Sequence, residues 1–392
     1  MPAAEPIFLH SLFRAAGALL LSRFRALGLR LTCYREPFNE ALIVLNDPKR
    51  HQKLLESRPC AAQGSVSRAR PEFYEYWVCR QPLSGLFRDR FAYQQYFVGD
   101  SGQLPPQQAL YLSTLLTHAA GRPVLQCCRS SGRLAALQRQ YGGAHVYVWR
   151  EPRAQWWSYR AAGYFDAANQ RIYRANHLPA ALGRVGAAVG AAAGEPSHLR
   201  PRESYLLFYA LWLDAWLRAC AHAQLSIGLD AVGSAAAEAT RCARQLSELV
   251  GCPLDLSAVR ATGMVFAAEE DAFYAQIERS VHEAFVADGQ VTAGELQGAI
   301  DAAYAARRCH ERRGRDRTAE PKLRQAALDM MDRLASQEEA ARQWSARHVA
   351  ARIGAYWRSF RLRPATGSAD PPSAPDTAGE DLRVTAQPGT LR

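Results

Sequence analysis

Length and composition describe an ordinary globular chain with an arginine-based positive charge. Its 392 residues are 48% hydrophobic and 22% charged, as in a soluble globular enzyme, and they suffice for one large or two modest domains. The net charge is +11, but the arginines are spread along the chain, so we expect no nucleic-acid partner. Lys49, Lys53 and Lys322 are the only lysines, so an anion site here must be built from arginine.

Cysteine spacing and the N-terminal pattern indicate the compartment. None of the nine cysteines falls in a Cys-x-x-Cys pair, which predicts buried free thiols in a reducing compartment and no zinc site. The apolar run 15–21 is too short to cross a membrane, and no basic segment precedes it. We therefore expect a cytoplasmic protein without stable membrane insertion.

Apolar runs typical of buried strands alternate with helical patterns along the chain. The strand-like runs are 6–13, 29–36, 122–129, 144–151 and 225–232. Helical patterns follow at 14–27, 133–142, 153–165, 204–223 and 237–251. This alternation predicts an α/β fold with an open, mainly parallel sheet flanked by helices. Active sites of such sheets lie outside the carboxyl ends of the strands.

Changes in composition predict three regions. These are an α/β domain over 1–265, a helical C-terminal region over 266–364, and a disordered, Pro/Ala/Ser-rich tail over 365–392. Within the first, the Ala/Gly-rich segment 180–196 fits either a mobile loop near the substrate or a helix of small residues.

The segment "FLHSLFRAAGALLLSRFR" (8–25) reads as a strand that runs through a small-residue turn into a helix. Such a turn presents free backbone amides at the positive end of the helix and can hold an anion without hydroxyl groups. Arg14 adds a cation. The predicted phosphate loop consists of Arg14, Ala15, Ala16, Gly17, Ala18 and Leu19.

A second candidate lies in "HVYVWREPRAQWWSYR" (145–160). Arg150 ends a strand, and Ser158 follows eight residues later in the next helix. An arginine and a serine so placed can grip one phosphate from two sides. Taken singly, Arg150 is better explained as a helix cap and Ser158 as an ordinary helical serine.

Together the two segments resemble the sulfotransferases that use 3′-phosphoadenylyl sulfate (PAPS). "CYREPFNEAL" (33–42) and "LQCCRSSGRLAALQRQYGGAHVYVWREPRAQWWSY" (125–159) are similar to the bacterial branch, and the resemblance covers roughly residues 6–260. It implies a P-loop-like architecture, PAPS as co-substrate without a metal, and sulfuryl transfer to a hydroxyl or amine of a small-molecule or carbohydrate acceptor. The chain departs from the family at Ala15, Gly17 and Ala18, which stand where Ser or Thr hydroxyls are usual.

The resemblance also implies roles for single residues. The first segment would hold the 5′-phosphosulfate, the second the 3′-phosphate, and Arg14 would neutralise the leaving 5′-phosphate. Glu36 in "CYREPFNE" is the candidate general base, with Glu40, about one helical turn on, as its substitute. The stretch "RSSGR" (129–133) either lines a pocket or forms a plain turn into a helix.

Two other functions stay open at this stage. The altered loop also fits a catalytically silent sulfotransferase-like protein that binds a nucleotide, and the α/β pattern also fits an unrelated nucleotide-dependent enzyme. The sequence indicates neither the acceptor nor the oligomeric state.

Overall fold

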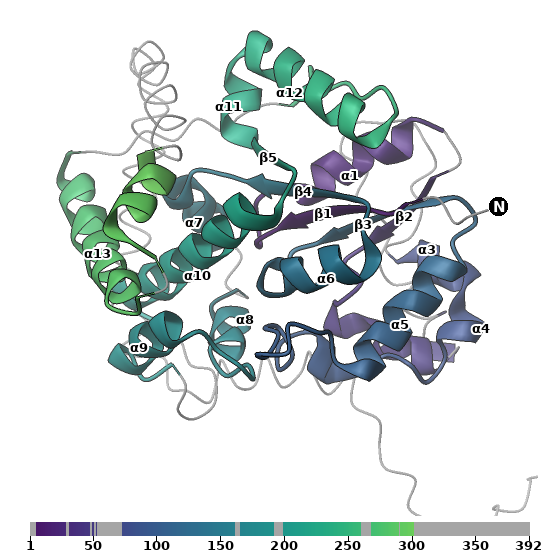
Figure 1. Cartoon of the computed structure of the whole chain (residues 1–392), viewed down its shortest axis with the longest axis horizontal. Helices are drawn as coiled ribbons and strands as arrows, with labels where there is room; N and C mark the ends of the chain where they lie inside the picture. The colour runs from purple at the N-terminus through teal and green to yellow at the C-terminus, as the bar shows by residue number, and fades with distance from the viewer. Residues whose placement is uncertain are drawn as a thin grey trace, which may run out of the picture.

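A computed structural model describes residues 5–28, 31–47, 49–50, 52, 73–160, 165–191, 199–259, 268–289 and 291–301. Within them, five strands form one sheet in which every neighbouring pair is parallel. The strands are β1 (Ile7–Ser11), β2 (Leu31–Arg35), β3 (Arg122–Cys127), β4 (Ala144–Trp149) and β5 (Leu225–Gly228). Helices flank the sheet on both faces, which confirms the predicted α/β class (Figure 1).

The strand order is β2-β3-β1-β4-β5, with β1 in the centre. The chain first leaves β1 for the edge position of β2, returns to β3 beside β1, and then crosses to β4 on the other side. The direction of travel therefore reverses at β1. In open parallel sheets the ligand crevice lies at the carboxyl ends of the strands at such a reversal. The topology thus places the expected ligand crevice beside the segment directly after Ser11.

Helices occupy the connections between the strands. Helices of eight or more residues among the described residues include α1 (Gly17–Ala26), α5 (Pro106–Thr117), α6 (Leu134–Tyr141), α7 (Pro152–Arg160), α8 (Phe165–Ile172), α9 (Ala180–Ala188), α10 (Pro201–His222), α12 (Ala236–Val250) and α13 (Ala268–Val286). The shorter α-helices are α3 (Tyr74–Val78), α4 (Arg80–Leu83) and α11 (Leu229–Ser234). Three 3₁₀ helices are η1 (Glu40–Asn46), η2 (Asp89–Phe91) and η3 (Ser131–Arg133).

Alternation along the strands divides the core into layers. Ile7 and Leu9 of β1 pack in one cluster with α1 and α12, whereas Phe8 between them packs in another with α5 and α6. Figure 1 shows α1, α11 and α12 on one face of the sheet and α6 and α10 on the other. Because all five positions of β1 are buried, the strand reads as an unbroken apolar run apart from its polar end.

The largest core cluster joins α10 to α13, beyond the predicted boundary at 265. Aromatic residues of α10 pack there with Tyr274, Ile277 and Val281 of α13. Arg153 of α7 also forms a buried ion pair with Glu278, 2.9 Å from Nε to Oε1. Helix α13 therefore packs against α7 and α10. Most of the predicted C-terminal region 266–364 and all of the predicted tail 365–392 lie outside the described residues.

Two further sequence expectations meet the structure here. In the Ala/Gly-rich segment 180–196, residues 180–188 form helix α9, which supports the helical interpretation for that half. Among the described residues, no helix is both long and apolar enough to span a membrane.

Candidate functional site

Parallel strands bring the predicted site residues to one edge of the sheet. Arg14 follows β1, Glu36 follows β2, Arg129 follows β3 and Arg150 follows β4. Each of these positions lies at the carboxyl end of its strand, which is where open α/β sheets bind ligands. The contacts at this edge decide which of these residues are available to a ligand.

The turn between β1 and α1 is tight and strained. Arg14 and Ala16 both have left-handed backbone conformations, with φ of 64° and 61°. For residues other than glycine this costs roughly 1–2 kcal/mol each. Ala16 caps α1 without any side-chain hydrogen bond, and the amide of Leu19 donates to the Ala16 carbonyl at 2.9 Å, so the amides of Gly17 and Ala18 are the ones left without a capping side chain. The turn thus presents free N–H groups at the positive end of a ten-residue helix.

Helix α7 holds this turn in place through two side chains. Gln155 Nε2 donates a hydrogen bond to the carbonyl of Phe13, at 2.8 Å. One turn further along α7, Ser158 Oγ accepts a hydrogen bond from Arg14 Nε, at 3.2 Å. Arg14 is exposed and Ser158 half-buried, so both side chains can reach a ligand. The structure therefore brings together one predicted residue from each of the two candidate segments.

The small residues of the turn differ in how much room surrounds them. Ala15 is buried, and Ala18 is exposed on the first turn of α1. A Cβ atom added to Gly17 would lie 2.9 Å from Ser11 Oγ and 3.1 Å from Gln126 Nε2. A larger residue at position 17 would therefore have to displace the side chain of Ser11 or Gln126, whereas Ala18 is exposed and has space for a larger side chain.

Arg150 is engaged by an acid that the sequence analysis did not identify. Its Nε donates to Asp230 Oδ1 at 3.1 Å, and the backbone N–H of Glu151 donates to Asp230 Oδ2 at 2.8 Å. Both side chains of this ion pair are buried. Ser158 bonds to Arg14, whereas the described contacts of Arg150 join it to Asp230 and, through its carbonyl, to Trp212.

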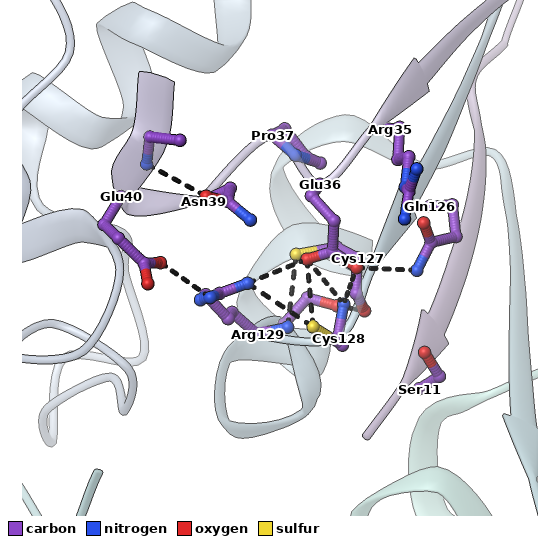
Figure 2. A network of polar contacts seen from close by, with 12 residues as sticks. Ser11, Arg35, Glu36, Pro37, Asn39, Glu40, Gln126, Cys127, Cys128 and Arg129 are labelled. Carbon is purple, nitrogen blue, oxygen red and sulfur yellow. Dashed lines mark hydrogen bonds and ion pairs between the residues drawn. The ribbon is translucent and has the colours of Figure 1, made fainter. Parts of the chain in front are cut away.

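Glu36 lies at the centre of a buried polar network (Figure 2). Arg129 Nη1 donates to Glu36 Oε2 at 3.1 Å, and Gln126 Nε2 donates to Oε1 at 2.8 Å. The backbone N–H of Cys128 lies 3.1 Å from Oε1, and its thiol donates to Oε2 at 3.0 Å. Both carboxylate oxygens thus already accept hydrogen bonds. The network joins the end of β2 to the end of β3.

Glu40 belongs to the same network. Arg129 Nη2 donates to Glu40 Oε2 at 2.6 Å, and Tyr93 OH donates to Oε1 at 2.9 Å. Arg129 is 2% exposed and so links two buried carboxylates. Burial and the neighbouring Glu36 raise the pKa of the Cys128 thiol well above its usual range, so this thiol stays protonated and acts as a donor.

Sequence reasoning missed three residues that shape the site: Gln126, Gln155 and Asp230. Two of them carried a signal. Gln155 precedes Ser158 by three residues and so lies on the same helical face, and Asp230 comes two residues after the end of β5. Gln126 lies inside a strand pattern and gave none. Among the residues that the structure describes, no cluster of three His, Cys, Asp or Glu side chains is arranged to hold a metal ion.

At this edge of the sheet, the β1–α1 turn with Arg14 and Ser158 is therefore accessible, whereas Arg129 and Arg150 have buried carboxylate partners. Comparisons of the chain with models of protein families, with curated proteins and with solved structures gave no match.

Proposed function

We propose that this chain binds PAPS at the β1–α1 turn and transfers its sulfuryl group to a hydroxyl or amine of a small-molecule or carbohydrate acceptor. One observation carries the proposal: Arg14 Nε lies 3.2 Å from Ser158 Oγ. The two residues come from segments that resemble two phosphate-binding segments of one family. They meet at the sheet edge where ligands of α/β proteins bind.

The turn has the chemistry for an anionic leaving group. In sulfuryl transfer, the bond from sulfur to the 5′-phosphate oxygen breaks while a bond to the acceptor oxygen or nitrogen forms. Negative charge therefore builds on the 5′-phosphate. The uncapped amides of α1 and the exposed guanidinium of Arg14 would stabilise that charge, with Ser158 holding the guanidinium in place.

The acceptor must also lose a proton, and this step tests the role of Glu36. Its oxygens accept hydrogen bonds from Arg129, Gln126 and Cys128. As a base, Glu36 would have to turn away from Arg129, which would keep Glu40 as a carboxylate partner. The base role therefore requires a rearrangement of a buried network.

That requirement favours a second candidate function, a sulfotransferase-like protein that binds the nucleotide without turnover. The loop without hydroxyl side chains points the same way, because each lost hydrogen bond to a charged group removes roughly 1.5–3 kcal/mol. Under this second function the Arg14–Ser158 site binds adenosine 3′,5′-bisphosphate, and no sulfuryl group is transferred.

A thermal-shift titration followed by a transfer assay separates the candidates. Adenosine 3′,5′-bisphosphate should stabilise the folded chain by about 2.7 kcal/mol at a hundredfold excess over Kd. ADP should stabilise it far less, because it lacks the 3′-phosphate that the resemblance assigns to the segment of Arg150 and Ser158. Arg14→Ala should lose the shift, whereas Arg244→Ala, an exposed arginine on α12, should keep it. Equal shifts with ADP or ATP would indicate an unrelated nucleotide-dependent enzyme.

Turnover decides between the first two functions. Wild-type protein is incubated with PAPS and a panel of hydroxyl and amine acceptors, and the release of the bisphosphate is followed. Acceptor-dependent release supports the transferase, and tight binding with no release supports the silent protein.

A further inference from the structure

The most unusual charged group outside the proposed site is Arg133. It is 1% exposed and lies in η3, after the end of β3. Its Nη2 donates to the carbonyl of Phe91 at 2.9 Å and its Nε to the carbonyl of Tyr96 at 3.4 Å. Its guanidinium also lies 4.1 Å from the ring centre of Phe38.

These contacts leave the charge of Arg133 without a carboxylate. No acidic side chain of the described residues forms an ion pair with it, and its Nη1 makes no hydrogen bond to them. An unpaired charge away from water is costly, and burial lowers the pKa of Arg133 to about 10. A bound anion would remove this cost.

Arg133 lines a cavity of about 170 Å³ between the 98–102 loop, α6 and the end of α10. The volume is several times the roughly 30 Å³ that one water molecule occupies in the liquid. Three further basic residues line the same cavity, namely Arg139, Arg218 and His222, and no acidic residue does.

The basic residues of the cavity wall differ in how firmly they are held. Arg218 forms an ion pair with Asp214, 2.8 Å from Nε to Oδ2, and so is partly neutralised. Arg139 is exposed and donates to the carbonyl of Gly102. Burial, together with the charges of Arg218 and Arg139, lowers the pKa of His222 at the same wall.

We propose that this cavity is a second anion site, which binds a small oxyanion group (sulfate, phosphate or carboxylate) between Arg133 and Arg139. Guanidinium groups suit such ligands because their parallel N–H groups match two oxygen atoms. The anion is either a free ion or the acidic group of a larger acceptor. The site is separate from the β1–α1 turn and does not depend on the nucleotide proposal.

Isothermal titration with sodium sulfate at constant ionic strength tests the site. The full chain carries Arg14→Ala in every sample, so that the β1–α1 turn does not contribute. This background protein should bind sulfate saturably, and adding Arg139→Gln should raise Kd by at least about tenfold, the loss expected for a charged hydrogen bond. The matched control Arg244→Gln, also an exposed arginine on a helix, should leave Kd unchanged.

A second variant protects the test against a fold defect. Arg133 itself is kept, because its loss would free two buried carbonyls. Instead, Ala135→Leu lengthens a side chain of the cavity wall and should abolish sulfate binding while every charge remains. Equal sulfate affinity in the background protein, Arg139→Gln and Ala135→Leu would overturn the proposal, and so would the absence of saturable binding.

Two further measurements complete the test. One distinguishes the possible sources of the anion, and the other distinguishes this proposal from the nucleotide proposal. If glucuronic acid competes with sulfate, the site accepts the acidic group of a larger molecule, and if only inorganic ions bind, it holds a free ion. Bisphosphate binding should survive in Arg139→Gln with Arg14 restored. Failure of sulfate binding with intact bisphosphate binding would thus sink this inference alone.

Discussion

Protonation of a buried histidine pair should destabilise this fold at mildly acidic pH. His145 of β4 is fully buried, and its Nε2 lies 3.0 Å from the carbonyl of Gly142. A carbonyl oxygen only accepts hydrogen bonds, so Nε2 of His145 carries the proton. Nδ1 of His145 then accepts a hydrogen bond from Nε2 of His10, at 2.9 Å. A second proton on His145 would set two N–H groups against each other.

The size of the effect follows from the pKa of His145. Burial lowers that pKa from 6.5 to about 4, although the hydrogen bond to Gly142 acts in the opposite direction. Between these values the unfolded chain binds more protons than the folded one, so stability rises with pH. The contribution of neutral His145 to the free energy of unfolding is complete above about pH 6.5 and falls as the pH drops toward 4. For His145 alone, the loss between pH 7.5 and pH 5 is about 2 kcal/mol.

The measurement is urea unfolding at pH 7.5, 6 and 5, followed by tryptophan fluorescence. His145→Gln keeps a donor and an acceptor but does not titrate, so it should lose about 2 kcal/mol less than wild type over this range. His118→Gln, at an exposed histidine after α5, should follow the wild type. If wild type and His145→Gln lose stability in parallel, His145 is not held neutral by the fold and the reasoning fails.

Three other substitutions test the site itself. Glu36→Gln should lower the free energy of unfolding, measured in urea, by about 1–3 kcal/mol because it breaks the buried ion pair with Arg129. Unchanged stability together with lost sulfuryl transfer would instead identify Glu36 as the general base. Arg150→Ala should lower the free energy of unfolding by about 3–5 kcal/mol, and adding Asp230→Asn should recover part of this loss. A loss of bisphosphate affinity without a loss of stability would contradict this and indicate that Arg150 binds the 3′-phosphate. Ala18→Thr should tighten bisphosphate binding by up to about 3 kcal/mol in calorimetry, and weaker binding would show that the turn rejects a hydroxyl.

The strands could be predicted from the sequence because their burial is continuous. Every residue of β1 and of β4 is buried, so each reads as an apolar run of strand length. The strand order was less accessible, since the long connection between β2 and β3 allows β3 on either side of β1. The sequence analysis also made no prediction for the helices between residues 73 and 117, whose aromatic residues fill one side of the core.

Only the parts of the site that lie within one continuous stretch of chain could be predicted from the sequence. The turn after β1 was visible as a strand, small residues and a helix within one stretch of chain. The partners were not visible, because Arg129 and Glu36 are 93 residues apart, and Arg150 and Asp230 are 80 apart. A long-range ion pair gives no local periodicity, so an arginine at a strand end looks the same whether it awaits a phosphate or holds a carboxylate.

The structure also changes how the hydroxyl-free turn is understood. Of the three positions where the family that the sequence resembles usually has hydroxyls, Ala15 is buried and Gly17 has the side chains of Ser11 and Gln126 against it. Ala18 alone is exposed with a right-handed helical backbone. Packing around the strained turn therefore leaves little room for a hydroxyl side chain at two of the three positions. The anion binding proposed for this turn would then depend on backbone amides, which remain in every substitution except one to proline, and on the guanidinium of Arg14.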